Sequence, residues 1–296
     1  MPQGGEPKVR FARQIITLSK PRVIFLLVVT GAAGVWKASE GDPDIAILLA
    51  VIFGGTLASA GSNAINQAFD SDIDALMRRT RHRPVPSNDI GAFYASAVGM
   101  FFIILSILIM FQWTNLLASI LMMVAAAVYV FVYTIVLKRR SWNNIVIGGA
   151  AGAFPPLIGA TAVSGEITAI GLYMFGFIFF WTPPHFWTLS ILLKDDYADA
   201  KIPMLSVVAS LRDTTVQIAL YVMLLIVFSW LPVVAGYAGL TFAFSSSILG
   251  VFWLQKIRLM FKEPSSKNTL STYKFSLLHL AVVFLVLALE PHLPWY

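Results

Sequence analysis

Asn66-Gln-Ala-Phe-Asp70-Ser-Asp72-Ile-Asp74 is the stretch that decides the fold and the function, and it closes a strongly apolar segment over 45–64. Asn66, Asp70 and Asp74 are spaced four residues apart, so on a helix they share one face, with a rise of roughly 6 Å per step. Mg²⁺ takes one or two carboxylates and completes its coordination with substrate phosphates. A basic run follows directly, at Arg78, Arg79, Arg81, His82 and Arg83. The sequence therefore predicts a diphosphate site at a membrane surface.

The composition is that of an integral membrane protein. Of the 296 residues, 58% are hydrophobic and 12% are charged, with a mean hydropathy of +0.77, whereas a soluble domain is nearer half apolar and a quarter charged. Apolar runs of about twenty residues indicate an all-α polytopic membrane protein. Cysteine is absent, which excludes disulfides and thiolate chemistry. The first fifteen residues are polar and basic and show no cleavable signal. They are also too short and too poor in serine for an organelle transit peptide, which favours a bacterial inner-membrane protein.

The chain is predicted to form one domain, 1–296, in which residues 1–16 are a cytoplasmic N-terminal tail. We expect nine transmembrane helices, over 17–37, 45–66, 91–111, 115–137, 144–163, 168–190, 214–235, 239–259 and 271–290. Two of these runs contain Pro-Pro, at 155–156 and 183–184, and each pair should kink or break its helix. Small residues over 58–62 and 148–153 should allow close helix packing.

The basic residues fix the predicted orientation. With the N-terminus in the cytoplasm, all of the 21 lysines and arginines except Lys37 fall on the cytoplasmic side, as the positive-inside rule demands. The formal net charge of +6 therefore reflects topology, and it gives no indication of a nucleic-acid partner. The partner that the composition does indicate is the lipid bilayer.

A second acidic cluster, Lys194-Asp-Asp-Tyr-Ala-Asp199, ends the predicted helix over 168–190. Asp195 and Asp199 repeat the four-residue spacing of the first motif, and we expect them to form the second metal half-site. Asp196 is rotated by about 100° from Asp195, yet a frayed helix end would bring it inward, so the ligand among the three is left open. The two motif-bearing helices are four apart, which suggests a four-helix pseudo-repeat with the site at the interface of its halves.

Asp72 lies about 200° around the helix from Asp70, so we expect it to pair with arginines and not with metal. The basic loops supply candidates for binding diphosphate: Arg79, Arg83, Lys138 and Lys194. Topology alone explains most loop arginines, so only some of this basic ring should contact phosphate. His185 is an ionisable group inside a span, which is a functional hypothesis by default; its alternative role is to satisfy carbonyls that the prolines free.

Longer motifs resemble one family. The spacing Asn66-x3-Asp70-x3-Asp74 with a later Asp-x3-Asp resembles the UbiA superfamily of intramembrane prenyltransferases. Three further segments resemble its protoheme IX farnesyltransferase branch: Gly148-Gly-Ala-Ala-Gly-Ala-Phe-Pro155-Pro156, Trp181-Thr-Pro-Pro-His185-Phe-Trp187, and Asp196-Tyr with Ile202-Pro-Met-Leu205. Gln67 stands where this branch often has a second asparagine. The resemblance covers nearly the whole chain, from Lys20 to the last predicted helix.

The resemblance implies nine helices around a central cavity and transfer of a farnesyl group from farnesyl diphosphate to haem B, with addition of water, to give haem O and diphosphate. It implies Mg²⁺ as the cofactor, held by Asn66, Asp70, Asp74, Asp195 and Asp199, of which the four aspartates are catalytic. His185 would bind haem. A haem A synthase or an oxidase assembly protein is the partner that such an enzyme suggests.

Three other readings stay open. A prenyltransferase for a quinone precursor or another aromatic acceptor would share the metal site without needing His185. A secondary transporter would share the helices and the repeat, but its site would lie near the bilayer midplane. A non-enzymatic haem-handling assembly protein would bind haem without consuming an isoprenyl diphosphate.

Overall fold

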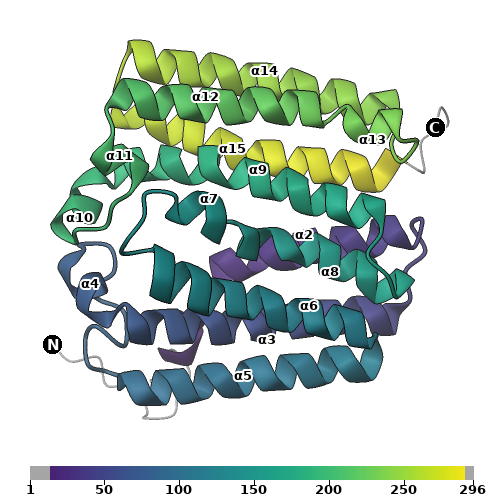
Figure 1. The fold of residues 1–296 in the computed structure, drawn as a ribbon, viewed down its shortest axis with the longest axis horizontal. Helices are drawn as coiled ribbons and strands as arrows, with labels where there is room; N and C mark the ends of the chain where they lie inside the picture. Colours follow the sequence, from purple (N-terminus) through teal and green to yellow (C-terminus); the bar gives the residue numbers. More distant parts are fainter. Residues whose placement is uncertain (1–13, 291–296) are drawn as a thin grey trace, which may run out of the picture.

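The computed structural model describes residues 14–290, and within them every regular element is helical (Figure 1). Most of the predicted N-terminal tail lies outside the described residues. The elements are α2 (Pro21–Ala38), α3 (Ile45–Phe69), α4 (Ser71–Leu76), α5 (Ala92–Trp113), α6 (Leu116–Ala127), η1 (Val128–Leu137), α7 (Asn144–Gly148), α8 (Ala150–Ser164), α9 (Ala169–Leu192), α10 (Lys194–Asp199), α11 (Leu205–Val208), α12 (Leu211–Phe228), α13 (Leu231–Val234), α14 (Leu240–Lys262) and α15 (Ser266–Leu289).

Every predicted span overlaps one long helix or two consecutive helical segments, with ends that differ by at most five residues. In the described part of the chain, seven spans are long and apolar enough to cross a membrane. The apolar part of α2, Val23–Ala38, is shorter, and α9 is not among the seven. The reason for α9 lies in its sequence, because Trp-Thr-Pro-Pro-His interrupts the apolar run. Much of α9 is nevertheless buried against other helices.

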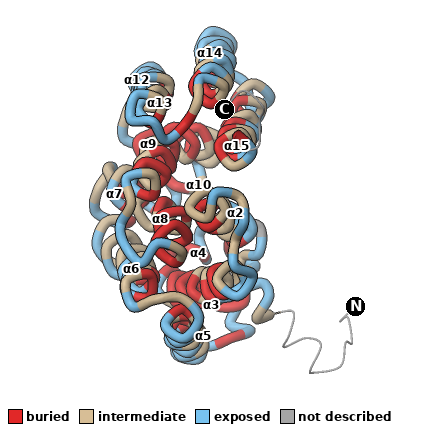
Figure 2. The backbone as a smooth tube through the Cα atoms, turned by 90° about the vertical axis from the view of Figure 1, so that its right-hand side faces the viewer, coloured by how far each residue is buried: buried red, intermediate tan, exposed pale blue. Residues whose placement is uncertain are grey.

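The long helices form two groups with the same order of neighbours. In the first, α3 packs on α5, α5 on α6, α6 on α8, and α8 returns to α3. In the second, α9 packs on α12, α12 on α14, α14 on α15, and α15 returns to α9. Helix α2 packs against α3 and α8 and also reaches α15, and α8 packs on α9, so these contacts join the groups (Figure 2).

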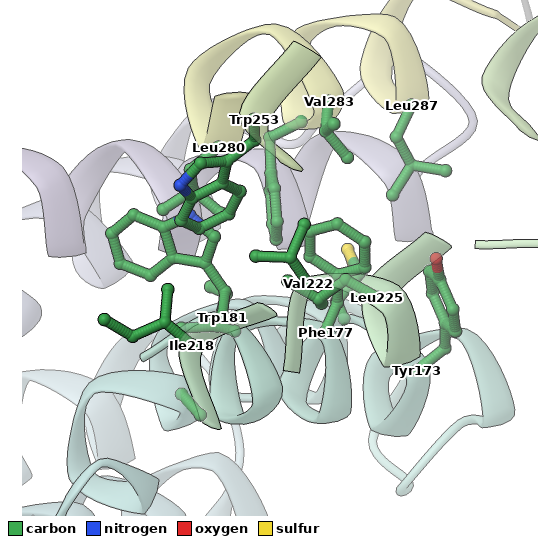
Figure 3. Packing of buried hydrophobic residues seen from close by; sticks show 14 of the residues in the cluster. Tyr173, Phe177, Trp181, Ile218, Val222, Leu225, Trp253, Leu280, Val283 and Leu287 are labelled. Carbon is green, nitrogen blue, oxygen red and sulfur yellow. The ribbon is translucent and has the colours of Figure 1, made fainter. Parts of the chain in front are cut away.

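The second group holds the larger apolar core. Phe177 and Trp181 of α9 pack with Trp253 of α14 and with Leu280 and Val283 of α15 (Figure 3). A smaller core around Val51, Met110 and Ile158 holds the first group together. Since helices in lipid gain little from apolar burial alone, close shape complementarity has to supply the packing energy.

Small residues provide that close contact where backbones meet. A Cβ on Gly61 of α3 would strike the carbonyl oxygen of Gly99 on α5, and one on Gly159 of α8 would strike that of Gly31 on α2. Gly152 has open space around it, so the prediction of close packing is wrong there. The proline pairs lie inside α8 and α9, and neither pair ends its helix.

Both acidic motifs lie at the same end of the molecule. Helix α3 ends at Phe69 and the chain turns into the short α4, while α9 ends at Leu192 and the chain turns into the short α10. Figure 1 shows α4 and α10 next to each other at one end of the long helices. Ile73 and Met77 pack there with Tyr197 and Ala200, so this contact joins the two groups beside the candidate site.

Candidate functional site

The first acidic motif forms a buried polar stripe. Asn66, Asp70 and Asp74 are 3%, 0% and 1% exposed. Asp70 ends α3 and begins α4, and backbone hydrogen bonds from Asp70 to Asn66 and from Asp74 to Asp70 carry the helical path across the junction. The Asn66 Nδ2 donates to Asp70 Oδ2 at 2.6 Å. The predicted one-face arrangement of these three residues is present in the structure.

Each member of the stripe has a basic partner. Lys138 Nζ donates to Asp70 Oδ2 in a buried ion pair. Arg83 Nη1 lies 2.5 Å from Asp74 Oδ2, and Lys20 Nζ donates to Asn66 Oδ1 at 2.9 Å. Buried charges are tolerated only when they are paired and hydrogen-bonded, so these cations allow the carboxylates to be buried.

An unusual helix brings Lys138 to the site. Residues 128–137 form the π-helix η1, a geometry that occurs mostly as single turns at functional sites. The wider turn places Tyr129, Thr134 and Lys138 on one face: Tyr129 Oη donates to Asn63 Oδ1 at 3.2 Å, and Thr134 Oγ1 accepts from Asn66 Nδ2 at 3.1 Å. Hydrogen bonds between polar side chains therefore connect α3 and η1 along their contact, and the last of them joins Lys138 to Asp70.

Asp72 is turned away from the stripe, as predicted, and pairs with an arginine. Both of its oxygens accept from Arg139, at 2.6 and 2.7 Å. These hydrogen bonds hold the pKa of the Asp72 carboxyl below its usual value and raise the pKa of Arg139. The pair lies at an open recess of about 380 Å³, lined also by Phe69, Ser71, Thr134 and Ile135.

The donor set suits a hard cation in part. Asp70 Oδ1 is buried and has no hydrogen-bond partner among the described residues, and carboxylate and amide oxygens of the stripe are the ligand type that Mg²⁺ takes. Among residues 14–290, however, no three His, Cys, Asp or Glu side chains gather closely enough to hold a metal ion on their own. The residues fit a site in which the substrate supplies further oxygens.

The second acidic motif is placed differently from the prediction. Asp195, Asp199 and Lys194 are exposed, so the predicted cluster of four carboxylates is not formed in this geometry. Tyr197 is the reason: it takes the buried face of α10, and residues two positions before and after it are rotated by about 200°. Burial raises the pKa of Tyr197. Asp196, which is half-buried, accepts from the backbone N–H of Arg78 at 3.4 Å.

The predicted diphosphate-binding residues also differ in their positions. Arg83 and Lys138 turn toward the stripe, whereas Arg79 is exposed and forms no ion pair with another described residue. Sequence reasoning missed Lys20, for which the only local signal was a Lys-Pro pair before an apolar run.

His185 is buried in an aromatic stack on α9. Its ring lies 4.3 Å from the Trp181 ring and 4.9 Å from the Tyr273 ring, nearly parallel to both. His185 Nδ1 lies 2.7 Å from Ser276 Oγ, whose own hydrogen goes to the Tyr273 carbonyl. The hydrogen-bond network thus assigns the proton to Nδ1. Nε2 is left with a lone pair, the form in which imidazole binds metals.

The comparisons with known proteins agree with one another. A profile of the UbiA prenyltransferase family matches residues 27–285. A protoheme IX farnesyltransferase of Thermus thermophilus is 42% identical over 94% of this chain and 46% of its own length, so the chain spans about half the length of that relative. The protein of the same name from Trichodesmium erythraeum is 40% identical over 92% of this chain and 84% of its own.

Solved structures show the same fold at lower identity. A digeranylgeranylglyceryl phosphate synthase superposes with a TM-score of 0.78 at 19% identity, over 95% of this chain and 98% of that one. A UbiA homologue from Archaeoglobus fulgidus, solved with GPP and Mg²⁺, gives 0.68 at 14% identity, over 93% and 99%. The arrangement of helices is therefore shared with these proteins.

Proposed function

Because the chain belongs to the UbiA prenyltransferase family, we propose that it is a protoheme IX farnesyltransferase, which converts haem B, farnesyl diphosphate and water to haem O and diphosphate. The observation that carries this proposal is the identity of about 40% with proteins of that name over more than nine-tenths of the chain. The histidine in its aromatic stack adds to it, because a prenyltransferase for a simple aromatic acceptor would have no use for a metal-binding imidazole.

The proposal includes the topology. Nine helices cross the bacterial inner membrane, the N-terminus is cytoplasmic, and the acidic motifs face the cytoplasm. The basic residues support this orientation, and the matching order of neighbours in the two helix groups supports the four-helix pseudo-repeat. Helices α2 and α9, which are not among the seven long apolar spans, would then be held in the membrane by their packing against the other seven.

On the donor side, Asp70, Asp74 and Asn66 would hold Mg²⁺ together with the diphosphate. The metal supplies charge stabilisation on the departing diphosphate. When the substrate binds, Lys138 and Arg83 can exchange the carboxylates for phosphate oxygens, since both are charged donors suited to them. From the second motif, Asp196 accepts a hydrogen bond from the Arg78 N–H just after α4, and Asp195 and Asp199 would need α10 to rotate before they could contribute.

On the acceptor side, His185 would bind the haem iron through Nε2, and Trp181 and Tyr273 would keep its ring in place. The reaction breaks the allylic C–O bond, and the electron pair leaves with the diphosphate. The vinyl carbon of haem bonds to the farnesyl carbon, and water adds to the resulting carbocation and loses a proton. Aromatic rings near the reacting carbon would stabilise the cationic charge.

A turnover assay tests the proposal. The purified full chain is incubated with haem B, farnesyl diphosphate and Mg²⁺, and the products are separated by mass. We expect a haem heavier by one farnesyl group and one water. If the protein binds haem and makes no modified haem, it is an assembly protein; if it binds no haem, it has a different prenyl acceptor.

His185→Ala tests the acceptor half separately. We expect weaker haem binding and little change in the affinity for diphosphate, because the histidine lies in the aromatic stack away from the acidic stripe. Haem titration followed by difference spectroscopy measures the haem affinity, and diphosphate titration by calorimetry measures the diphosphate affinity. Unchanged haem affinity in the variant would show that His185 only satisfies its serine partner.

A further inference from the structure

Three side chains of α3 hold the chain segment that precedes α2. Gln67 Nε2 donates to the Leu18 carbonyl at 2.8 Å, and Asn63 Nδ2 donates to the Ser19 carbonyl at 3.1 Å. The third contact runs the other way, from Lys20 Nζ to Asn66 Oδ1. Three consecutive residues are thus fixed by one polar face of α3, the same helix that carries the acidic stripe.

The backbone at Lys20 is held in a disfavoured conformation. Its φ of 55° and ψ of 63° lie in the left-handed region, which residues with a Cβ rarely adopt. Pro21 follows, and a proline disfavours the right-handed helical conformation in the residue before it. Strain of this kind persists where the surroundings over-determine it, and it clusters at functional sites. Here its effect is to direct the ammonium group into the site.

The Lys20 ammonium lies at a site whose carboxylates already have basic partners. Lys138 pairs with Asp70 and Arg83 pairs with Asp74, whereas no carboxylate of the described residues forms an ion pair with Lys20. Its hydrogen-bond partner is the neutral amide of Asn66. The two carboxylates of the stripe thus have cationic partners of their own, and Lys20 adds a further basic group beside them that has no ion-pair partner among the described residues. The local excess of positive charge favours an anion as the ligand.

We propose that Lys20 binds a phosphate group of the diphosphate substrate, and that its hydrogen bond to Asn66 is the resting arrangement of that lysine. The inference rests on the proposed function, since it assigns a residue to the same donor site. Binding of the anion would draw the ammonium from Asn66 Oδ1 and leave this oxygen to the metal. Lys20 is thereby a diphosphate-binding residue contributed by the segment before α2.

Lys20→Gln is the variant that isolates the charge, because its amide can still donate to Asn66 and spare the fold. The titrant is inorganic diphosphate with Mg²⁺, added to the full chain in detergent and followed by calorimetry. We expect the Kd to rise about tenfold or more, since a hydrogen bond between charged groups is lost. The KM for farnesyl diphosphate should rise with it, while haem affinity stays the same. Lys20→Arg should recover part of the affinity.

The matched control is Lys262→Met, which removes an exposed lysine at the end of α14 and should leave the Kd unchanged. If Lys20→Gln binds diphosphate as the wild type does and only its melting temperature falls, Lys20 merely fixes α2 to α3 and the proposal is wrong. If the wild type itself binds no diphosphate, the proposed function fails and the role of Lys20 fails with it. The wild-type titration therefore distinguishes the two failures.

Discussion

The two acidic motifs have the same spacing and opposite surroundings. Asp70 and Asp74 are almost completely buried and each has a basic partner. Asp195 and Asp199, at the corresponding point of the second helix group, are exposed and form no ion pair within the described chain. The two halves therefore contribute unequally to the candidate site, although their helices have matching neighbours.

The difference arises where each long helix ends. At both junctions the backbone hydrogen bonds continue, through Asp70 and Asp74 from α3 into α4 and through Leu193 and Tyr197 from α9 into α10. Asp195 and Asp199 lie two positions after Leu193 and Tyr197, so they fall on a different face from the one that Asp70 and Asp74 occupy in the first motif. Helix α9 ends at Leu192, and on the short α10 that follows it is Tyr197 that is buried. Equal spacing therefore predicts a common face, whereas the position of the motif relative to the end of the long helix decides whether that face is buried.

The strongest test of the comparison is Asp70→Asn. The substitution keeps the shape and removes the charge that pairs with Lys138, so we expect turnover to fall by roughly 10²–10³-fold and the response to added Mg²⁺ to weaken. Turnover measured over a range of Mg²⁺ concentrations checks this. Asp195→Asn, in the exposed motif, is the matched control; an equal loss in both variants would show that the motifs are functionally equivalent.

Lys138→Met tests why the first motif can be buried at all. Removing one partner of a buried ion pair leaves the other charge uncompensated, which typically costs about 3–5 kcal/mol, so the melting temperature should fall clearly. Lys194→Met, on the exposed α10, should leave it unchanged. Thermal unfolding in detergent measures both variants. A melting temperature of Lys138→Met equal to that of the wild type would mean that Asp70 does not depend on this cation.

Within the second motif, Asp196 should matter more than its neighbours. It is half-buried and faces the α4 end through Arg78, whereas Asp199 points to solvent. We expect Asp196→Asn to lower kcat/KM for farnesyl diphosphate about tenfold, the effect of one lost charged hydrogen bond, and Asp199→Asn to change it little. The opposite ranking would show that α10 rotates when substrate binds, and that the spacing-based assignment of Asp195 and Asp199 was right.

Local patterns predicted the helices and the stripe well, because apolar runs and four-residue spacing depend only on neighbours along the chain. The contact between Lys20 and Asn66, by contrast, joins residues 46 positions apart, and no local signal specifies it. The π-helix η1 is formed by an uninterrupted apolar run that would equally suit an ordinary α-helix. The position of Lys138 beside Asp70 could therefore not be predicted from the sequence. At α10, the competition between Tyr197 and the aspartates for the buried face decided the outcome.

The smallest effect is expected from Asp72→Asn, although Asp72 lies within the first motif. Its side chain is 64% exposed and its partner Arg139 is 38% exposed, and exposed ion pairs contribute at most about 1 kcal/mol. Because the pKa of folded Asp72 lies below its unfolded value of about 3.9, the contribution is present at neutral pH and is lost as the pH falls through the folded pKa. At low salt, the melting temperature of the variant should differ slightly from that of the wild type, and at high salt this difference should disappear.

A large loss of turnover in this variant would mean that Arg139, once released from Asp72, pairs with Asp70 Oδ1, which lies 3.7 Å from its Nη2. The exposed position beside the motif would then control the buried one.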